Sequence, residues 1–183
     1  MNKKAAKEQY MRMQLADPNV SEFEKEQIRQ RLGIVIFVAE SDFTNKHGDE
    51  LFEFVFRYLN NHLTRIRQQK RTNSPFDFLS ENLKAMYHLS TYANVFEDDC
   101  LAYMLDESKN DYKLLSKSFE MIGKKNEATL INSMLTKRVI TNEEIEKLQE
   151  HFWDSNTIVH ELNMTIEKFI VSNITELIEL QKK

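Results

Sequence analysis

Apolar residues recur every three or four positions along most of the chain, which is the spacing of an amphipathic α-helix. One such stripe predicts a long helix that starts at Asp49 and ends in a basic tail; its members are Leu51, Phe54, Val55, Tyr58, Leu59, His62, Leu63 and Ile66. A second stripe predicts a final helix of more than 20 residues from about Ser155, and it consists of Ile158, Leu162, Ile166, Phe169, Ile170, Ile174 and Leu177. We expect both stripes to face the core.

Helix-start signals separate the predicted helices. Two capping boxes, each a Ser or Thr followed three residues later by Glu, predict helix starts; they are Ser21 with Glu24 and Thr141 with Glu144. Ser74 as N-cap and Pro75 in the first helical position predict another start. Further helices are predicted from Asn110 or Asp111 as cap, from Asn126 to Leu135, and from Asn142 to Trp153.

Helix-stop signals complete the pattern. Proline disfavours helix in the residue before it, so Asp17-Pro18 ends a first helix that runs from Lys3 to Leu15. Gly123 predicts a left-handed C-cap after Ile122. We also predict a break between residues 90 and 94, before a helix from 95 to 105.

The run Ile34-Val35-Ile36-Phe37-Val38 is the one stretch with the composition of a β-strand. No comparable run exists elsewhere to pair with it, and apolar residues around it keep helical spacing; these are Leu32, Val35, Ile36, Ala39 and Phe43. We therefore predict that the helix that begins after Ser21 continues through this run as buried helix, with Gly33 as a weak point.

Glycine and proline are scarce, with 3 Gly and 2 Pro in 183 residues. Tight turns between strands need these residues, so their scarcity favours long helices joined by polar caps. We predict an all-α protein with about eight helices in a single domain over residues 1–183, in which residues 1–17 are a docked or mobile N-terminal helix. No sheet of more than two strands is expected.

Several functional classes are disfavoured by simple counts. No apolar run of about 18 residues exists, and the N-terminus lacks the apolar stretch of a signal peptide, so we expect a cytoplasmic protein with no membrane partner. Cys100 is the single cysteine, which excludes an intrachain disulfide and a multi-cysteine metal site.

Charge is unevenly distributed along the chain. Residues 1–71 hold 13 Lys and Arg against 10 Asp and Glu, while residues 72–183 hold 12 against 19, so the parts carry net charges of +3 and −7. The basic part ends in a cluster of His62, Arg65, Arg67, Lys70 and Arg71. Cations at a helix C-terminus are stabilised by the helix dipole, and a pI of 5.8 disfavours a nucleic-acid binder, so we expect no direct nucleic-acid partner.

Acidic residues form two groups in the second part of the chain. The first group is our candidate partner-binding face, and it consists of Glu97, Asp98, Asp99, Asp106, Glu107 and Asp111. The second group is Glu143, Glu144, Glu146, Glu150 and Asp154. Each group is also explained by ordinary solvated helix starts, because carboxylates near helix N-termini are stabilised.

Catalytic patterns are thin, and we expect no enzyme, no cofactor and no metal. His151 and Asp154 stand near His160 and Glu161, but without the His-Glu-x-x-His pattern of a zinc site. His47, beside Asp49 and Glu50, fits a polar cap. The glycines are solitary, so no phosphate-binding glycine loop is available.

The segment from Tyr92 to Phe169 resembles a known family. The resemblance is carried by short motifs in order: Cys100-Leu101-Ala102-Tyr103-Met104-Leu105, Phe119-Glu120-Met121-Ile122-Gly123, Glu127-Ala128, Leu130-Ile131, Leu148, Phe152-Trp153 and a last helix from Leu162 to Ile170. In this order they are similar to the DUF4375 domain of the DMP19-like family of DNA mimic proteins. The resemblance implies an all-helical, dimeric protein whose acidic surface occupies the DNA-binding face of a transcriptional regulator.

Three functional hypotheses remain, and the one with the least support, placed third, is an enzyme or a metal protein. In the first, the chain is an acidic interaction module, a DNA mimic or inhibitor that binds a basic, DNA-binding protein such as a transcriptional regulator. In the second, it is an immunity-type or scaffold protein that binds one partner by shape. We also expect a homodimer, with the stripe from Ile158 to Ile178 or the stripe from Phe54 to Ile66 helping to form the contact.

Overall fold

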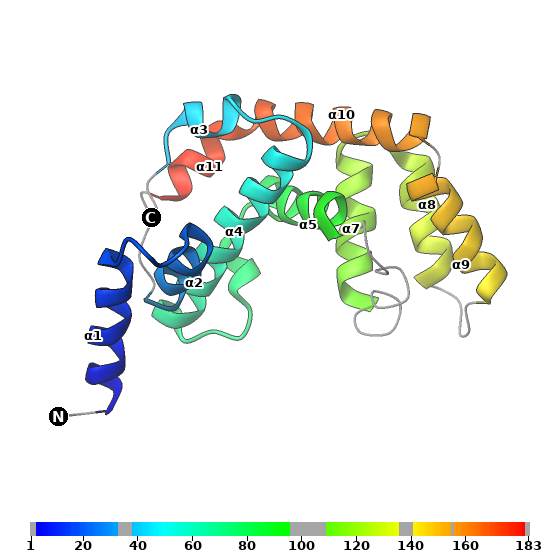
Figure 1. Ribbon diagram of the computed structural model, residues 1–183. Helices are drawn as coiled ribbons and strands as arrows, with labels where there is room; N and C mark the ends of the chain where they lie inside the picture. The colour runs from blue at the N-terminus through cyan, green and yellow to red at the C-terminus, as the bar shows by residue number, and fades with distance from the viewer. Residues whose placement is uncertain (1–2, 33–37, 96–108, 136–140, 155, 182–183) are drawn as a thin grey trace. The chain divides into compact units, whose positions relative to one another are not determined.

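The computed structural model describes residues 3–32, 38–95, 109–135, 141–154 and 156–181. These residues form ten α-helices, one 3-10 turn and one π turn, and they contain no strand (Figure 1). The predicted all-α class is confirmed. The number of helices among the described residues exceeds the predicted eight for two reasons. The five-residue helix α3 (Glu40–Thr44) is too short to show an apolar stripe in the sequence, and the last predicted helix is divided in two.

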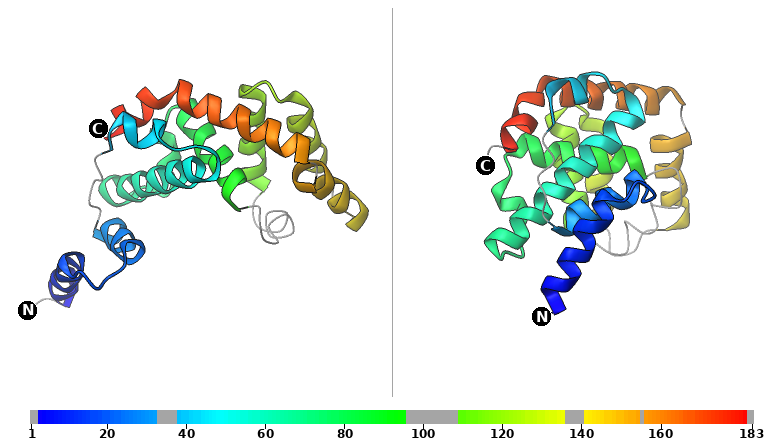
Figure 2. Two further views of the ribbon diagram at one scale, coloured as in Figure 1. Left: turned by 45° about the horizontal axis from the view of Figure 1, so that its top comes forward. Right: turned by 60° about the vertical axis from the view of Figure 1, so that its left-hand side comes forward.

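The chain divides into two compact units, which we call unit 1 and unit 2. Unit 1 comprises residues Met1–Phe37 and Asn60–Phe78. Its elements are α1 (Lys3–Ala16), α2 (Glu22–Leu32), residues 60–70 of α4 (Gly48–Lys70) and the 3-10 turn η1 (Pro75–Phe78). Helices α1 and α2 pack side by side (Figure 2).

Unit 2 comprises residues Val38–Leu59 and Leu79–Lys183. Besides α3 and the first half of α4, it holds α5 (Glu81–Val95), α7 (Lys109–Met121), α8 (Lys125–Leu135), α9 (Asn142–Gln149), the π turn η2 (Glu150–Asp154), α10 (Asn156–Ser172) and α11 (Ile174–Leu180). Helix α7 lies between α5 and α8, and α10 packs on α5 and η2 (Figures 1 and 2).

The two predicted apolar stripes are buried. The side chains of Leu51, Val55, Leu59 and Leu63 on α4, and of Leu162, Ile166 and Ile170 on α10, are each at most 4% exposed. An aromatic cluster joins α5, α7 and η2, because the Tyr92 ring lies 5.2 Å from that of Phe119 and 5.9 Å from that of Phe152. The buried stripes leave little apolar surface for a contact between copies, and the homodimer stays a prediction.

Predicted caps that depend on neighbours in the sequence are confirmed. The Ser21 N–H donates to Glu24 Oε2 at 3.1 Å, and the Glu24 N–H donates to Ser21 Oγ at 3.2 Å. At the end of α7, Gly123 takes a φ of +80°. The N–H of the residue after it, Lys124, donates to the carbonyl of Phe119 at 2.8 Å, which completes a Schellman motif.

The predicted continuation of the helix after Ser21 through the run 34–38 is wrong at its last residue, Val38, and residues 33–37 lie outside the described residues. Helix α2 ends at Leu32, and Val38 and Ala39 are non-helical. The side-chain amide of Gln181 pairs with both backbone groups of Val38, at 2.9 and 3.0 Å. A side chain 143 residues away thus satisfies the backbone that a helix would otherwise have bonded.

Helix α5 corrects two further predictions. Pro75 begins only the short turn η1, and α5 starts at Glu81, where Ser80 Oγ accepts the Leu83 N–H at 3.2 Å. The predicted break between residues 90 and 94 is absent, because α5 continues to Val95 with Ser90 and Tyr92 buried. The burial of one face against the rest of unit 2 outweighs the weak local helix preference of this stretch.

Two predicted helix boundaries also shift. Helix α7 begins at Lys109, so Asn110 and Asp111 lie inside it and do not cap it. The single C-terminal helix is interrupted at Asn173, where φ is −120° and ψ is 15°. The Asn173 side chain donates to the Phe169 carbonyl at 2.8 Å and accepts from Asn82 at 3.0 Å, so a local bond to the backbone replaces the helical pattern.

Candidate functional site

Most of the predicted partner-binding face lies outside the described residues: Glu97, Asp98, Asp99, Asp106 and Glu107 all fall between residues 96 and 108. Asp111 belongs to the first turn of α7. The described part of the chain therefore brings none of these carboxylates together, and the face stays a prediction.

Charge separates more sharply between the two units than along the sequence. Unit 1 holds 11 Lys and Arg against 6 Asp and Glu, a net charge of +5. Unit 2 holds 14 against 23, a net charge of −9. The difference grows because the fold assigns the acidic stretch 38–59 to unit 2.

Many cations of unit 2 are neutralised within the unit. Six described cations form ion pairs with carboxylates of the same unit: Lys46 with Glu50, Arg57 with Glu53, Lys84 and Lys117 with Glu81, Lys124 with Glu161, and Lys147 with Glu143. Since 23 carboxylates stand against 14 cations in unit 2, and six of these cations are bonded within the unit, a surplus of carboxylates remains.

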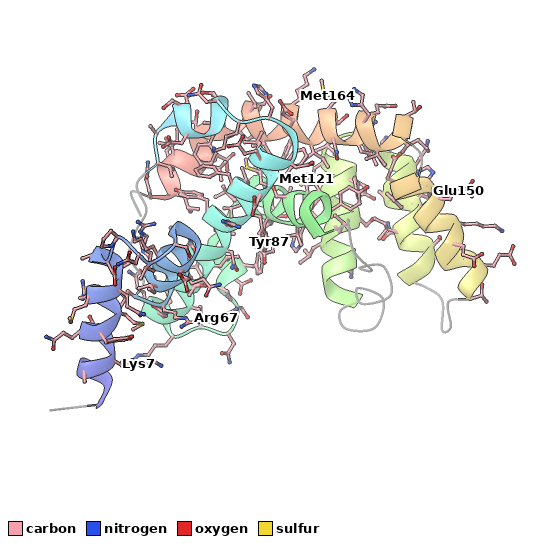
Figure 3. The ribbon with its side chains drawn as sticks, in the orientation of Figure 1. Lys7, Arg67, Tyr87, Met121, Glu150 and Met164 are labelled. Carbon is pink, nitrogen blue, oxygen red and sulfur yellow. The ribbon has the colours of Figure 1, made fainter. Side chains whose placement is uncertain are left out.

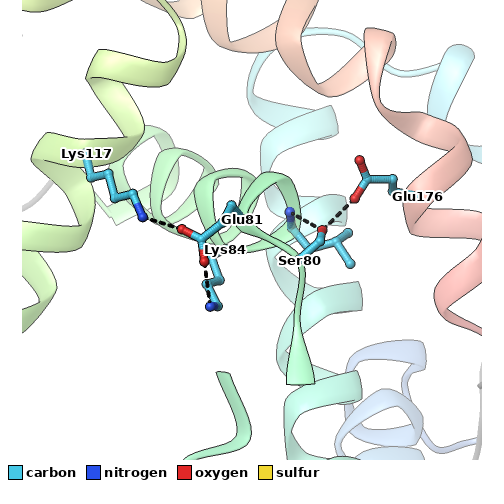
Figure 4. A network of polar contacts seen from close by, with 6 residues as sticks. Ser80, Glu81, Lys84, Lys117 and Glu176 are labelled. Atoms are coloured by element: carbon cyan, nitrogen blue, oxygen red, sulfur yellow. Dashed lines mark hydrogen bonds and ion pairs between the residues drawn. The ribbon is translucent and has the colours of Figure 1, made fainter. Parts of the chain in front are cut away.

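Glu81 shows how such pairs also hold helices together. Its carboxylate accepts from Lys84 on α5 and from Lys117 on α7, and these bonds lower its pKa from 4.5 to about 2 (Figure 4). Nearby, Ser80 Oγ donates to Glu176 Oε2 on α11 at 2.5 Å. These contacts connect α5 with α7, and the residue that precedes α5 with α11.

Helix α9 presents carboxylates of the second predicted acidic group. The Thr141 N–H donates to Glu144 Oε2 at 3.0 Å, which confirms the second capping box and positions the helix start. Glu143, Glu146 and Glu150 then lie on one side of the helix at helical spacing, and all three are exposed (Figure 3 labels Glu150). Glu143 is paired with Lys147 at 2.8 Å, which lowers the pKa of its carboxyl.

The end of α9 is anchored in the core by the π turn η2. Phe152 is 2% exposed, and its carbonyl accepts from the Tyr92 hydroxyl at 3.2 Å. His151 Nε2 lies 3.7 Å from Oε1 of Glu127, a carboxylate that is 9% exposed. Burial, and then the Glu127 charge, raise the pKa of the Tyr92 phenol. Sequence spacing did not reveal this group, since its members come from α5, α8 and η2.

A polar hollow of about 350 Å³ opens at the turn between α7 and α8. It is lined by Gly123, Lys124, Lys125, Asn126, Glu127, Ile158 and Glu161. Lys124 is bonded to Glu161 within it, so its two central charges already satisfy each other.

No group of three or more His, Cys, Asp or Glu suited to a metal exists in the described part of the chain. His47 Nδ1 lies 2.8 Å from Glu167 Oε1, and the Gly48 N–H donates to Glu167 Oε2 at 3.0 Å. The group that caps the start of α4 is therefore Glu167 on α10, and His47 bonds to that carboxylate instead of capping the helix itself.

The basic end of α4 lies in unit 1 and contrasts with the paired cations of unit 2. Arg67, Lys70 and Arg71 are exposed and form no ion pair among the described residues (Figure 3 labels Arg67). Nη1 of Arg65 is buried without a hydrogen-bond partner there. His62 is 8% exposed and belongs to the buried side of the helix.

Comparisons of the chain with protein-family models, with curated proteins and with solved structures find no match. Among the described helices, none is both long and apolar enough to cross a membrane.

Proposed function

We propose that the protein is an acidic protein-interaction module without catalytic activity, and that unit 2 binds a basic protein partner. The observation that carries the proposal is the separation of charge, which gives unit 2 a net charge of −9. In keeping with the family resemblance, the partner is a DNA-binding protein, such as a transcriptional regulator, whose DNA site the acidic surface occupies.

The pairing inside unit 2 supports this proposal. Several exposed carboxylates lie without a cation among the described residues: Asp49, Glu120, Glu146, Glu150 and Glu179. Exposed carboxylates keep their hydration until a partner arrives, so they attract a basic protein over long range and mainly raise its association rate. An acidic surface of this kind loses its attraction as salt rises.

Two acidic segments are candidates for the contact. The first is the predicted face of Glu97, Asp98, Asp99, Asp106, Glu107 and Asp111. The second is the side of α9 that bears Glu143, Glu146 and Glu150. The second segment is attached to the core through Phe152, so its carboxylates belong to a helix with a fixed base.

The test begins by capturing partners of the full chain from lysate at low salt and purifying the candidate. Its association rate is then measured with two neutralised triples, Asp98→Asn/Asp99→Asn/Glu107→Gln and Glu143→Gln/Glu146→Gln/Glu150→Gln. A matched triple in unit 1, Glu8→Gln/Asp17→Asn/Asp77→Asn, removes the same charge.

We expect at least one triple in unit 2 to slow association tenfold or more at 50 mM salt, with the unit 1 triple within twofold of the unaltered chain. Duplex DNA should compete with the protein for the partner. If neither unit 2 triple slows association and the rate is the same at 500 mM salt, binding is by shape and the scaffold or immunity hypothesis replaces this one.

A further inference from the structure

The end of α4 gathers cations that nothing in the described chain neutralises. Arg65, Arg67, Lys70 and Arg71 fall within the last six residues of the helix and the residue after it. Asp77 is the only carboxylate between residues 60 and 78. In unit 2, by contrast, cations are regularly bonded to carboxylates three or four residues away or on the next helix. The exposed cations at the end of α4, Arg67, Lys70 and Arg71, are therefore available to an external anion.

Two of these arginines, Arg71 and Arg65, adopt conformations that are unfavourable for the stability of the fold by itself. Arg71 has a φ of +51°, a left-handed conformation in which glycine or asparagine is preferred. Arg65 holds a buried Nη1 without a hydrogen-bond partner among the described residues. A buried unpaired donor is unusual in a folded protein and commonly marks a position where water or an ion completes the contact.

We propose that this surface, formed by Arg65, Arg67, Lys70, Arg71 and Phe78, binds the phosphate backbone of single-stranded nucleic acid. Three of its four cations are arginines. The guanidinium group presents a planar fork of donors that matches two phosphate oxygens, whereas the lysine ammonium acts as a point charge. The chemistry of the surface thus favours phosphate over scattered carboxylates.

Phe78 is the feature that favours a single strand. Its side chain is 50% exposed, and it ends the turn η1, which follows α4 after a short connection. That connection is held by the Ser74 N–H donating to Thr72 Oγ1 at 3.0 Å and by the Asp77 N–H donating to the Ser74 carbonyl at 3.2 Å. An exposed aromatic ring in the same segment of the chain as exposed cations is the combination that single-strand binders use, with the cations on the backbone and the ring stacked on an unpaired base.

This inference revises the expectation that the protein has no nucleic-acid partner. That expectation used the pI of the whole chain, 5.8, which averages two units of opposite charge. For unit 1 alone the net charge is +5, so the average does not describe the surface that a nucleic acid would meet. The inference is independent of the proposed function, which concerns unit 2.

The experiment measures fluorescence anisotropy of a labelled single-stranded 20-mer RNA of mixed sequence, titrated with the full chain at 50 to 200 mM KCl. The variant Arg67→Gln/Lys70→Gln/Arg71→Gln tests the surface. A control, Lys113→Gln/Lys125→Gln/Lys168→Gln, removes the same charge from exposed lysines of unit 2. Phe78→Ala tests stacking, with a duplex of the same sequence as a second ligand, and circular dichroism checks folding.

We expect the basic triple to weaken RNA binding at least tenfold and the control triple to weaken it less than twofold. The slope of log K against log salt should be about −2 to −3 for three or four phosphate contacts, and it should approach zero in the basic triple. Phe78→Ala should weaken single-strand binding about fivefold or more and leave duplex binding unchanged.

Three results would overturn the proposal. The first is the absence of RNA binding at 50 mM KCl up to about 100 μM protein. The second is an equal loss in the control triple, which would show a response to net charge alone. The third is equal binding of poly-glutamate, which has no bases or phosphates and would assign the surface to an acidic protein.

Discussion

The two units of this chain carry net charges of opposite sign, +5 in unit 1 and −9 in unit 2. In unit 2, 23 carboxylates outnumber 14 cations, and six of these cations are bonded to carboxylates, so the unit keeps a surplus of negative charge. In unit 1, Arg67, Lys70 and Arg71 at the end of α4 form no ion pair among the described residues. Pairing decides which charges are free for a partner, and net charge alone does not.

The units also differ in the strength of their cores. The most completely buried side chains belong almost entirely to unit 2, and among them are Phe119, Leu162 and Ile166, each 0% exposed. In unit 1 the buried apolar residues are fewer and include Ile28, Leu63 and Ile66. We therefore expect substitutions in unit 2 to have the largest effects on stability.

The largest effect is expected for Phe119→Ala, which removes a ring at 0% exposure from the cluster with Tyr92 and Phe152. Deleting a buried Phe side chain costs about 3–5 kcal/mol, through lost burial and the cavity left behind. Urea unfolding monitored by the fluorescence of Trp153, the single tryptophan, measures the loss. Phe78→Ala in unit 1 is the matched control and should change stability by less than about 1 kcal/mol, since Phe78 is half exposed. Equal losses would contradict the contrast between the two units.

A smaller effect is expected for Gln181→Ala. This variant leaves the Val38 N–H and carbonyl without the side-chain amide that bonds them. It should lower the free energy of unfolding by about 1–3 kcal/mol. Gln181→Glu retains the acceptor and loses the donor, so its stability should lie between that of Gln181→Ala and that of the unaltered chain. Thermal unfolding by circular dichroism measures both, and a Gln181→Ala variant as stable as the unaltered chain would contradict the role of this contact.

Arg71→Gly is expected to stabilise unit 1, whereas Arg67→Gly should destabilise it by about 0.5–1 kcal/mol. The left-handed φ of Arg71 suits glycine, while Arg67 lies within α4, where glycine is disfavoured. The gain at Arg71 should not exceed about 1 kcal/mol, because glycine also adds freedom to the unfolded chain. The test is whether the free energy of unfolding rises in Arg71→Gly and falls in Arg67→Gly. Two decreases of equal size would refute the strain at Arg71.

The last of these effects is a pKa shift at the surface of unit 2. Glu81 has its pKa lowered to about 2 by Lys117 and Lys84, so its contribution to stability is complete above about pH 4.5 and is lost as the pH falls to about 2. In Lys117→Met the pKa should rise toward 4.5 but stay below it, because Lys84 remains. An NMR titration of the Glu81 carboxyl at low salt measures the shift, and an unchanged pKa would show that the pair with Lys117 does not form in solution.

Local signals in the sequence predicted much of the fold. The capping boxes at Ser21 and Thr141 and the glycine cap at Gly123 involve residues within a few positions of each other, so the sequence contains all of their partners. The end of the helix before Val38 depends on Gln181, and the start of α5 at Ser80 replaces a locally favourable start at Pro75. These outcomes depend on distant contacts that periodicity does not contain.

The candidate site follows the same rule. The sign of the net charge in each part of the chain could be predicted, since it follows from the counts of charged residues. The ion pairs could not be predicted from the sequence, because Glu81 and Lys117 are 36 positions apart and Lys124 and Glu161 are 37 positions apart. The exposed cations at the end of α4 therefore became distinct only when several cations of unit 2 were seen to be bonded.

The central claim is that the two units serve partners of opposite charge. Its most direct test measures, at 50 mM salt, how fast the purified basic partner associates with three forms of the chain. The first form is the unaltered chain. The second is neutralised in unit 2 at Asp98, Asp99, Glu107, Glu143, Glu146 and Glu150, and the third is neutralised in unit 1 at Arg67, Lys70 and Arg71. We predict that neutralising unit 2 slows association at least tenfold, while neutralising unit 1 leaves it unchanged or slightly faster, because a repulsive surface is removed. A slower rate on neutralising unit 1, or an unchanged rate on neutralising unit 2, would contradict the claim.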